Sequence, residues 1–155
     1  MWPPWEPTQG LPYGHVKAKG GGPLKKTGIL NPEICRVIAA LGHTDMLTIC
    51  DAGLPIPLAP ERIDLTVVAG LPAFLDVLRA VADEFPTEKL ILAHETYQVS
   101  PQMWEEVRKV FPGLPVEFHP HPVFKEFVAR SKAVIRTGEC TSYSNLILVA
   151  GVTYG

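Results

Sequence analysis

The sequence has little charge and no long apolar run, and each shortage excludes a class of protein. Charged residues make up 19%, and 14 basic against 16 acidic residues give a net charge of −2. This balance offers no electrostatic surface typical of binding to nucleic acid or to an anionic membrane. No stretch reaches the roughly 18 apolar residues of a membrane span. The first residues also lack the charged and then apolar regions of a secretory signal.

Cysteine is equally sparse. The three cysteines, Cys35, Cys50 and Cys140, lie far apart, and no Cys-x-x-Cys motif occurs. An odd number without paired spacing indicates neither a disulfide framework nor a zinc knuckle. Free thiols within apolar runs are typical of a reducing compartment. We therefore expect a cytoplasmic protein with Cys35 and Cys50 in its core.

Proline and glycine, in contrast, are concentrated at the start of the chain. Residues 1–24 hold five prolines and five glycines without a repeat, a composition typical of disorder. Residues 25–155 have the length and hydrophobicity of one globular domain. We hypothesise that translation starts near Leu24 and that the leader is a gene-start artefact or an appendage.

Helical and strand patterns alternate along the rest of the chain. Asn31 and Pro32 are typical of the N-cap and first position of a helix, and Ser100 and Pro101 predict a second helix in the same way. Apolar spacing predicts helices over 32–41, 74–81, 101–110 and 123–128 and strands over 46–50, 62–68, 89–93, 116–118, 133–135 and 146–150.

This alternation predicts a three-layer α/β domain, with a largely parallel or mixed sheet and helices on both faces. The last two strands are joined by a short polar loop, whereas a parallel pair needs a crossover of a dozen or more residues. We therefore expect at least one antiparallel pairing, which makes the sheet mixed.

Titratable and polar side chains follow four of the predicted strands directly. Ligands of open α/β sheets bind beyond the carboxyl ends of the strands, although loops are polar in any case. The candidate groups are Asp51, the pair His94 and Glu95, the pair His119 and His121, and Glu139 with Tyr143 and Asn145 in the following loop.

His43 stands apart from these groups, because it precedes strand 46–50 whereas Asp51 follows it. The eight residue steps from His43 to Asp51 span about 26 Å when extended. If both serve one reaction, either the segment folds back or another subunit completes the site. The second alternative is favoured, because the apolar run 54–59 would otherwise form an exposed hydrophobic patch.

Structural alternatives exist for each candidate. His43 could bridge a helix terminus to Asp45, and Asp51 could simply bond backbone amides in a turn. His119 and His121 have the spacing of a metal-binding pair. Zinc, however, needs three or four ligands, and the others would have to come from distant segments. We therefore expect no metal.

Several motifs together resemble the RbsD/FucU family. They are Lys-Lys-Thr-Gly-Ile-Leu-Asn from residue 25, Leu-Gly-His-Thr-Asp from 41, Cys-Asp-Ala-Gly-Leu-Pro-Ile-Pro from 50, Arg-Ile-Asp-Leu from 62, Val-Ile-Arg-Thr-Gly-Glu-Cys-Thr-Ser-Tyr-Ser-Asn from 134 and Ala-Gly-Val-Thr from 150. The resemblance covers residues 25–155. Gly53 and Cys140 favour the ribose branch of the family over the fucose branch.

The resemblance implies a function and a set of site residues. The family interconverts ring forms of a free sugar, here the β-pyranose and β-furanose forms of D-ribose, without a cofactor. It forms a ring-stacked homodecamer with its sites between subunits. His43 matches the family's proton donor. Asp51, His121, Tyr143, Ser144 and Asn145 match its sugar-binding residues, although Ser144 stands where alanine is common.

The chemistry agrees with these residue types. Ring opening needs a base at the anomeric hydroxyl and an acid at the ring oxygen, and imidazole exchanges protons near neutral pH. Two alternatives stay open from the sequence: an L-fucose-type mutarotase, and a non-catalytic sugar-binding accessory of ribose uptake.

Overall fold

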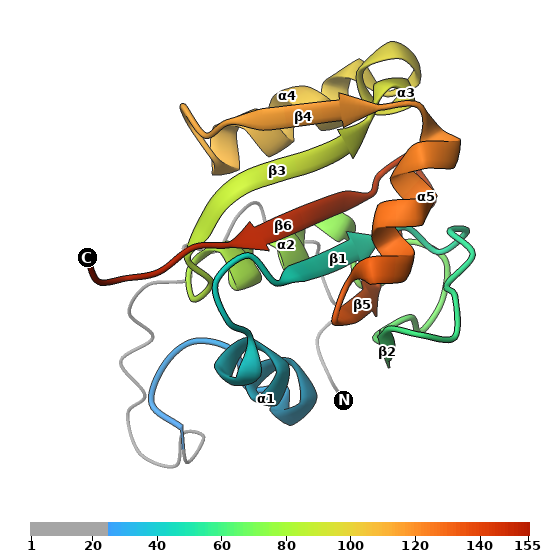
Figure 1. Cartoon of the computed structure of the whole chain (residues 1–155). Coiled ribbons are helices and arrows are strands. Elements are labelled where there is room, and N and C mark those ends of the chain that lie inside the picture. Colours follow the sequence, from blue (N-terminus) through green and yellow to red (C-terminus); the bar gives the residue numbers. More distant parts are fainter. Residues whose placement is uncertain (1–24) are drawn as a thin grey trace, which may run out of the picture.

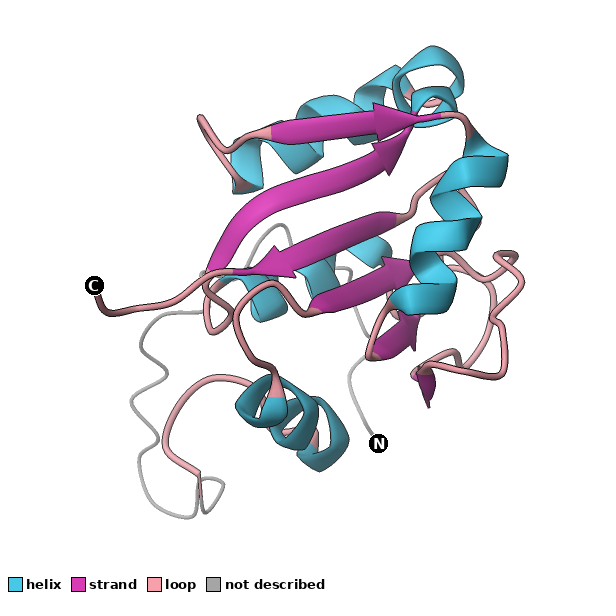
Figure 2. Cartoon of the chain, viewed as in Figure 1, coloured by secondary structure: helices cyan, strands magenta, loops and turns pink. Residues whose placement is uncertain are grey.

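A computed structural model describes residues 25–155, and the predicted leader lies outside these described residues. The elements, in chain order, are α1 (Pro32–Ala40), β1 (Met46–Cys50), β2 (Glu61–Asp64), α2 (Phe74–Ala82), β3 (Thr87–Ala93), α3 (His94–Val99), α4 (Pro101–Val110), β4 (Val116–His119), α5 (His121–Arg130), β5 (Ala133–Arg136) and β6 (Leu146–Ala150) (Figures 1 and 2). No helix in this part of the chain is long and apolar enough to cross a membrane.

The six strands form one mixed sheet in the order β2-β5-β1-β6-β3-β4. β1 pairs in parallel with β5, as do β2 with β5 and β3 with β4. β6 is inserted between β1 and β3 and is antiparallel to both. The expected mixed sheet is therefore confirmed, although β5 and β6 are not neighbours because β1 separates them.

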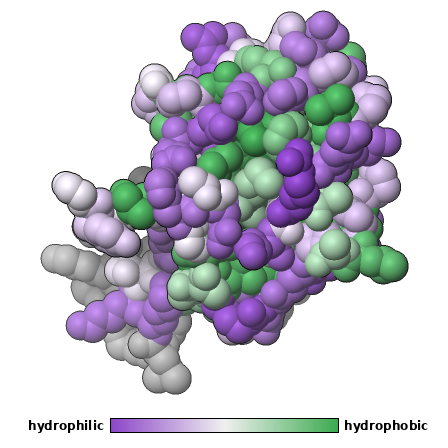
Figure 3. Space-filling view, viewed as in Figure 1, coloured by the Kyte–Doolittle hydropathy of each residue, from purple (hydrophilic) through white to green (hydrophobic). Residues whose placement is uncertain are grey.

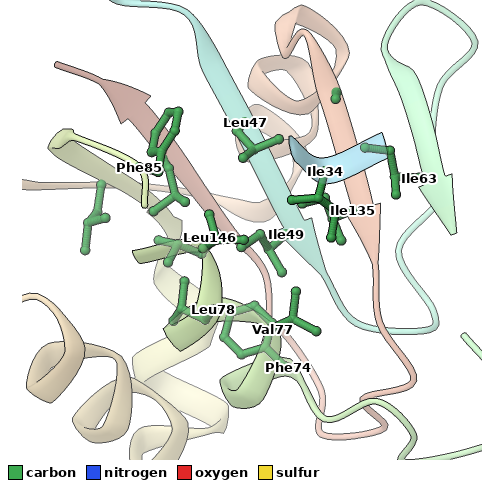
Figure 4. Close-up of a cluster of buried hydrophobic side chains, with 14 of the residues drawn as sticks. Ile34, Leu47, Ile49, Ile63, Phe74, Val77, Leu78, Phe85, Ile135 and Leu146 are labelled. Carbon is green, nitrogen blue, oxygen red and sulfur yellow. The ribbon is translucent and has the colours of Figure 1, made fainter. Parts of the chain in front are cut away.

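Both faces of the sheet are covered by helices, as the sequence predicts. In β1, Leu47 and Ile49 point into a core formed with α1, α2 and α4, whereas Cys50 points to the opposite face, under α5. Figure 4 shows Phe74 and Leu78 of α2 beside Ile49 and other side chains of the sheet. The domain has three layers, with α5 on one side and the other main helices on the other.

Helix starts are held by different groups in different places. The Asn31 side chain accepts the amide hydrogen of Ile34 at 3.0 Å, so the predicted N-cap of α1 is confirmed. Ser100 and Pro101 likewise stand at the N-cap and first position of α4, as predicted, but Ser100 does not cap the helix with its side chain. This side chain instead donates to the carbonyl of Ser142 at 2.6 Å.

Three larger differences from the predicted elements bear on the candidate residues. The strand expected over 62–68 ends at Asp64, because the Asp64 carboxylate accepts the amide of Thr66 and turns the chain. Residues 94–99 form the helix α3, which the sequence pattern does not reveal because only Thr96 of it is buried. α5 begins at His121 rather than 123, so this imidazole stands on the first helical position.

The sheet topology brings the candidate residues to one edge. Because five strands run in one direction and β6 in the other, the carboxyl ends of β1, β3, β4 and β5 meet where β6 begins. Asp51, Glu95, His121 and the loop 137–145 all follow or precede strands at this edge. His43 lies at the opposite edge, beside Thr44, whose amide donates to the carbonyl of Ala150.

Gly138 is the position in this loop that tolerates least added volume. A Cβ there would overlap the backbone of Leu71, and the Gly138 amide donates to the Pro72 carbonyl at 2.8 Å. Since backbone atoms cannot move aside cheaply, we expect Gly138→Ala to reduce the free energy of unfolding by about 1–3 kcal/mol.

Urea denaturation of Gly138→Ala beside Gly42→Ala checks this expectation. Gly42 is a suitable control because the nearest atom to its added Cβ is Asp45 Oδ2, at an ordinary 3.6 Å. Equal stability of the two variants would contradict the packing argument.

Candidate functional site

Buried polar side chains are concentrated at the edge of the sheet where β1 ends. The described residues contain eight buried polar side chains: Asp51, Thr96, Ser100, Thr137, Ser144 and Asn145 at this edge, and Thr48 with Ser131 elsewhere. Thr48 and Ser131 bond to each other at 2.7 Å and so satisfy their own polarity. The remaining six converge on one place, which makes it the strongest candidate site.

Asp51 closes the turn that follows β1. Its Oδ1 accepts the amides of Gly53 at 3.0 Å and Leu54 at 2.9 Å. The turn-forming interpretation is therefore correct for one carboxylate oxygen. It does not account for the whole residue, because a turn alone does not need a carboxylate that is 8% exposed.

The loop 137–145 meets Asp51 from the other side. Asn145 Oδ1 accepts the Asp51 amide hydrogen at 2.9 Å, and Ser144 is fully buried beside it. Tyr143 adopts a left-handed backbone conformation with a φ of 57°. Its ring packs edge-on against the imidazole of His121, with 5.1 Å between the ring centroids.

His121 is held by the start of α5. Pro120 is the N-cap and offers no side-chain cap, so the His121 amide donates instead to the Glu95 carboxylate, 3.0 Å away. The imidazole also stacks on Phe124, one turn further along. The structure thus brings together Asp51, His121 and the predicted triplet 143–145 within one chain.

Burial shifts the pKa values of both titratable groups against their charged forms. It raises the pKa of Asp51, and hydrogen bonds from backbone amides and the Asn145 side chain oppose it only in part. Burial also lowers the pKa of His121. Lys125 adds to this effect, whereas Glu95 and Asp51 oppose it. A neutral imidazole that can accept a proton therefore lies near a carboxylate.

Two buried polar atoms of the described residues have no hydrogen-bond partner, and both belong to this site: His121 Nδ1 and Ser144 Oγ. Unpaired buried polar atoms are uncommon in proteins and point to a ligand or to bound water. A sugar hydroxyl can donate and accept, so it suits both atoms.

His43 is not part of this cluster. It lies at the other end of β1, and its Nε2 is 2.8 Å from Glu88 Oε2 on β3. Asp45, the partner proposed as a structural alternative, instead accepts the amide of Gly42 at 2.9 Å. A single chain therefore keeps the predicted proton donor away from the predicted sugar-binding residues.

The two other histidines of the described residues, His94 and His119, have different partners. His119 Nε2 is 3.4 Å from Glu117 Oε2, and its ring packs on Phe127. His94 bonds to the Tyr97 hydroxyl at 3.2 Å. Within residues 25–155 no three or more histidine, cysteine, aspartate or glutamate side chains are grouped so that they could hold a metal ion.

Sequence reasoning missed several residues of this region. Glu88 pairs with His43, and Lys125 lies near His121 at i+4 on α5. The helical spacing from His121 could have indicated Lys125. No sequence signal indicates that Thr96 and Ser100 bond to the loop, because these contacts span more than 40 positions.

Comparison with known proteins shows to which family this chain belongs. The sequence model of the RbsD / FucU transport protein family matches residues 24–153. The chain belongs to the RbsD/FucU family. This confirms the resemblance seen in the motifs.

Individual members of the RbsD/FucU family are close in sequence. A D-ribose pyranase from Geobacillus kaustophilus is 50% identical over 131 residues, which cover 84% of this chain and 96% of the relative. A D-ribose pyranase from Haemophilus influenzae is 45% identical over 139 residues, covering 84% of this chain and all of the relative.

Solved structures of the RbsD/FucU family share the fold. Bacillus subtilis RbsD complexed with D-ribose has a TM-score of 0.82 and 43% identity, covering 84% of this chain and 100% of RbsD. A fucose mutarotase from Streptococcus pneumoniae, complexed with L-fucose, has a TM-score of 0.69 at 20% identity over 79% of this chain and 94% of the mutarotase. The second likeness supports the fold alone.

The environment of His121 leads to a pH-dependent prediction. Its folded-state pKa is lowered, so the unfolded chain binds the proton at a higher pH than the folded chain. The stability contribution of His121 is therefore complete above its ordinary pKa of about 6.5 and is lost as the pH falls toward the folded value.

Two measurements check this prediction. NMR titration of the folded protein should give His121 a pKa below its ordinary value. The free energy of unfolding should fall less on acidification in His121→Asn than in the wild type. An imidazole that titrates at or above its ordinary value would show that burial does not dominate here.

Proposed function

We propose that this protein is a D-ribose pyranase, which interconverts the β-pyranose and β-furanose forms of D-ribose. The observation that carries the proposal is the identity of 45–50% to D-ribose pyranases over nearly their whole length. RbsD, the structural match with a TM-score of 0.82, was solved in complex with D-ribose. The two orphaned buried polar atoms at the site suit a ligand rich in hydroxyl groups.

The reaction needs only proton transfers. A base takes the proton of the anomeric hydroxyl, the bond between C1 and the ring oxygen breaks, and an acid protonates that oxygen. The open-chain aldehyde then closes through a different hydroxyl, which loses its proton while the carbonyl oxygen gains one. No electron is transferred and no phosphate bond is broken, so the mechanism requires no cofactor.

The residues at the end of β1 bind and orient the sugar. Asp51 has one oxygen committed to backbone amides, and its other oxygen can accept from a sugar hydroxyl. His121 offers its unpaired Nδ1, and Ser144 its unpaired hydroxyl. Tyr143 and Asn145 shape the wall around them. Asp51 and His121 can also share in the proton transfer.

His43 supplies the catalytic proton from a neighbouring subunit. The carboxylate of Glu88 is a hydrogen-bond acceptor for His43 Nε2, which leaves Nδ1 to exchange a proton with the sugar. Because β1 separates His43 from Asp51 in one chain, the complete site lies between subunits. We propose the ring-stacked homodecamer of the family as the assembly.

Exposed apolar side chains support self-association. Leu54 packs into the core, but Leu58 in the same apolar run is fully exposed, so the predicted patch exists in part. Val67, Val68 and Leu71 are exposed as well. Figure 3 shows apolar side chains reaching the surface between polar ones on the face viewed. Val67, Val68 and Leu71 lie together, since Val68 and Leu71 form a β-bridge, and a contiguous exposed apolar cluster suits an interface.

A role in ribose catabolism in the cytoplasm completes the proposal. All three cysteines are free, which suits a reducing compartment. Burial raises the pKa of the Cys50 thiol to about 12, so this cysteine is an inert core residue. The protein makes both ring forms of free ribose available to enzymes that accept only one.

The first test measures the exchange rate of D-ribose ring forms by saturation-transfer NMR, with catalytic amounts of protein. We expect the wild type to accelerate exchange and His43→Ala to lose about 10²–10⁴-fold, because it removes a positioned acid/base group. A non-catalytic accessory would leave the wild-type sample no faster than buffer.

His119→Ala is the matched control, since His119 also pairs with a glutamate and lies outside the proposed site. We expect it to retain wild-type exchange. An unchanged rate in His43→Ala rules this residue out as the proton donor. L-Fucose in the same assay separates a ribose enzyme from a fucose mutarotase.

The second test addresses the shared site. His43→Ala and Asp51→Asn should each be inactive alone, because each removes one half of every site. Random co-assembly of the two should restore about a quarter of the wild-type activity, since each site has a chance of about one in four of holding both intact residues.

Co-expression with two different tags, followed by two-step purification, provides the mixed oligomers. The separately purified variants, mixed without dissociation, are the control. Mixed oligomers as inactive as either variant would place both residues in the same chain's site.

A further inference from the structure

We propose that Thr96 and Ser100 are positioning residues, whose hydroxyl groups hold the loop 137–145 in its sugar-binding conformation. This inference rests on the proposed function and extends it to residues that do not touch the sugar. The two hydroxyls come from α3 and from the junction of α3 with α4, which lie beside the start of α5 in Figure 1.

The hydroxyls take two successive carbonyl groups of the loop. Thr96 Oγ1 donates to the Tyr143 carbonyl at 2.9 Å, and Ser100 Oγ donates to the Ser142 carbonyl at 2.6 Å. Both residues are buried, Thr96 almost completely. Because both donor side chains are buried and the two bonds partly so, removing a hydroxyl costs more than removing an exposed one.

The Ser100 hydroxyl bonds to the loop instead of capping the helix that follows it. Serine before a helix normally accepts a backbone amide of the first turn. Here the residue stands at the N-cap of α4, yet its hydroxyl makes no capping bond. The hydroxyl serves the loop, 42 positions further along the chain.

We call the two bonds from Thr96 and Ser100 to the loop the clamp. Tyr143, one of the two residues that they hold, has an unusual backbone conformation. Tyr143 has a φ of 57°, a left-handed conformation that bulky L-residues rarely adopt. Such a conformation persists only where the surrounding structure imposes it. The bonds to the carbonyls of Ser142 and Tyr143 hold this turn from outside the loop, together with the bond between Asn145 and the Asp51 amide.

The clamp fixes two halves of the site relative to each other. Thr96 holds Tyr143, and the preceding residue of α3, Glu95, accepts the amide of His121. Two adjacent side chains therefore set the edge-on packing of the Tyr143 ring on the His121 imidazole. Ser144 and Asn145, which follow directly, meet Asp51.

The test compares Thr96→Val, which removes the hydroxyl at nearly constant shape, with Thr96→Ser, which retains it. Thr48→Val is the matched control, because it removes another buried hydroxyl bond, that to Ser131, outside the site. Two readouts are measured on the full-length protein: the KM and kcat of ribose exchange, and the pKa of His121 by NMR without sugar.

We expect Thr96→Val to raise KM about tenfold with a much smaller change in kcat, because the loop residues bind sugar in ground and transition states alike. The pKa of His121 should rise toward its ordinary value as the Tyr143 ring loosens and water enters. Thr96→Ser should restore both values, and Thr48→Val should change neither. Ser100→Ala should move both readouts in the direction of Thr96→Val.

A purely structural role predicts a different pattern. Thr96→Val and Thr48→Val would then both lower the melting temperature and leave the KM and the His121 pKa alone, which would overturn the proposal. If Thr96→Val does not fold, Ser100→Ala decides by the same two readouts.

The two proposals fail separately. A wild type that does not accelerate ribose exchange overturns the proposed function, while the His121 pKa in Thr96→Val still reports whether the clamp exists. An active wild type with unmoved values in Thr96→Val and Ser100→Ala overturns the clamp alone.

Discussion

The arrangement of the strand ends depends on one irregular segment, the loop 137–145, which is buried at its first and last residues. Buried backbone groups outside helices and strands need partners inside the protein, and the neighbouring strand ends provide them. The Thr137 hydroxyl and amide both donate to the Cys50 carbonyl, and the Glu139 carbonyl accepts from the Ala52 amide. Together with the hydroxyls of the α3–α4 junction, these bonds join β1, β5 and β6 at one edge. The candidate site lies at this edge of the sheet, where the loop meets the ends of β1 and β5 and the start of β6.

This requirement explains how the helices near the site are capped. The N-cap residues of α2 and α5 are Ala73 and Pro120, which offer no side-chain cap. Carboxylates from distant segments take their place: Glu139 accepts the amide of Phe74, and Glu95 accepts that of His121. Local helix signals are weak here because the caps come through the tertiary structure. The starts of α2 and α5 and the loop 137–145 are consequently parts of one hydrogen-bonded network.

Whether an element depends on local or on long-range contacts also decides how well the sequence could predict it. Apolar spacing was sufficient for the main helices and for most strands, since these elements bury a regular stripe, and the strand-end rule located Asp51 and His121. The helix α3 was missed because it buries only Thr96. The packing of Tyr143 on His121 depends on a left-handed residue and on a bond across 47 positions, which no local pattern encodes. His43 was correctly placed away from Asp51, because a strand between two residues fixes their separation in any fold.

The candidate site combines several features that lower the stability of the folded chain. Burial opposes both the charge on Asp51 and that on His121, and it leaves His121 Nδ1 and Ser144 Oγ without partners. Each feature makes the empty folded chain less stable than a fully paired core would be. A free sugar carries hydroxyl groups that can donate and accept at each of these positions. In the function proposed above, the binding free energy would come largely from polar atoms that the fold has already desolvated and fixed.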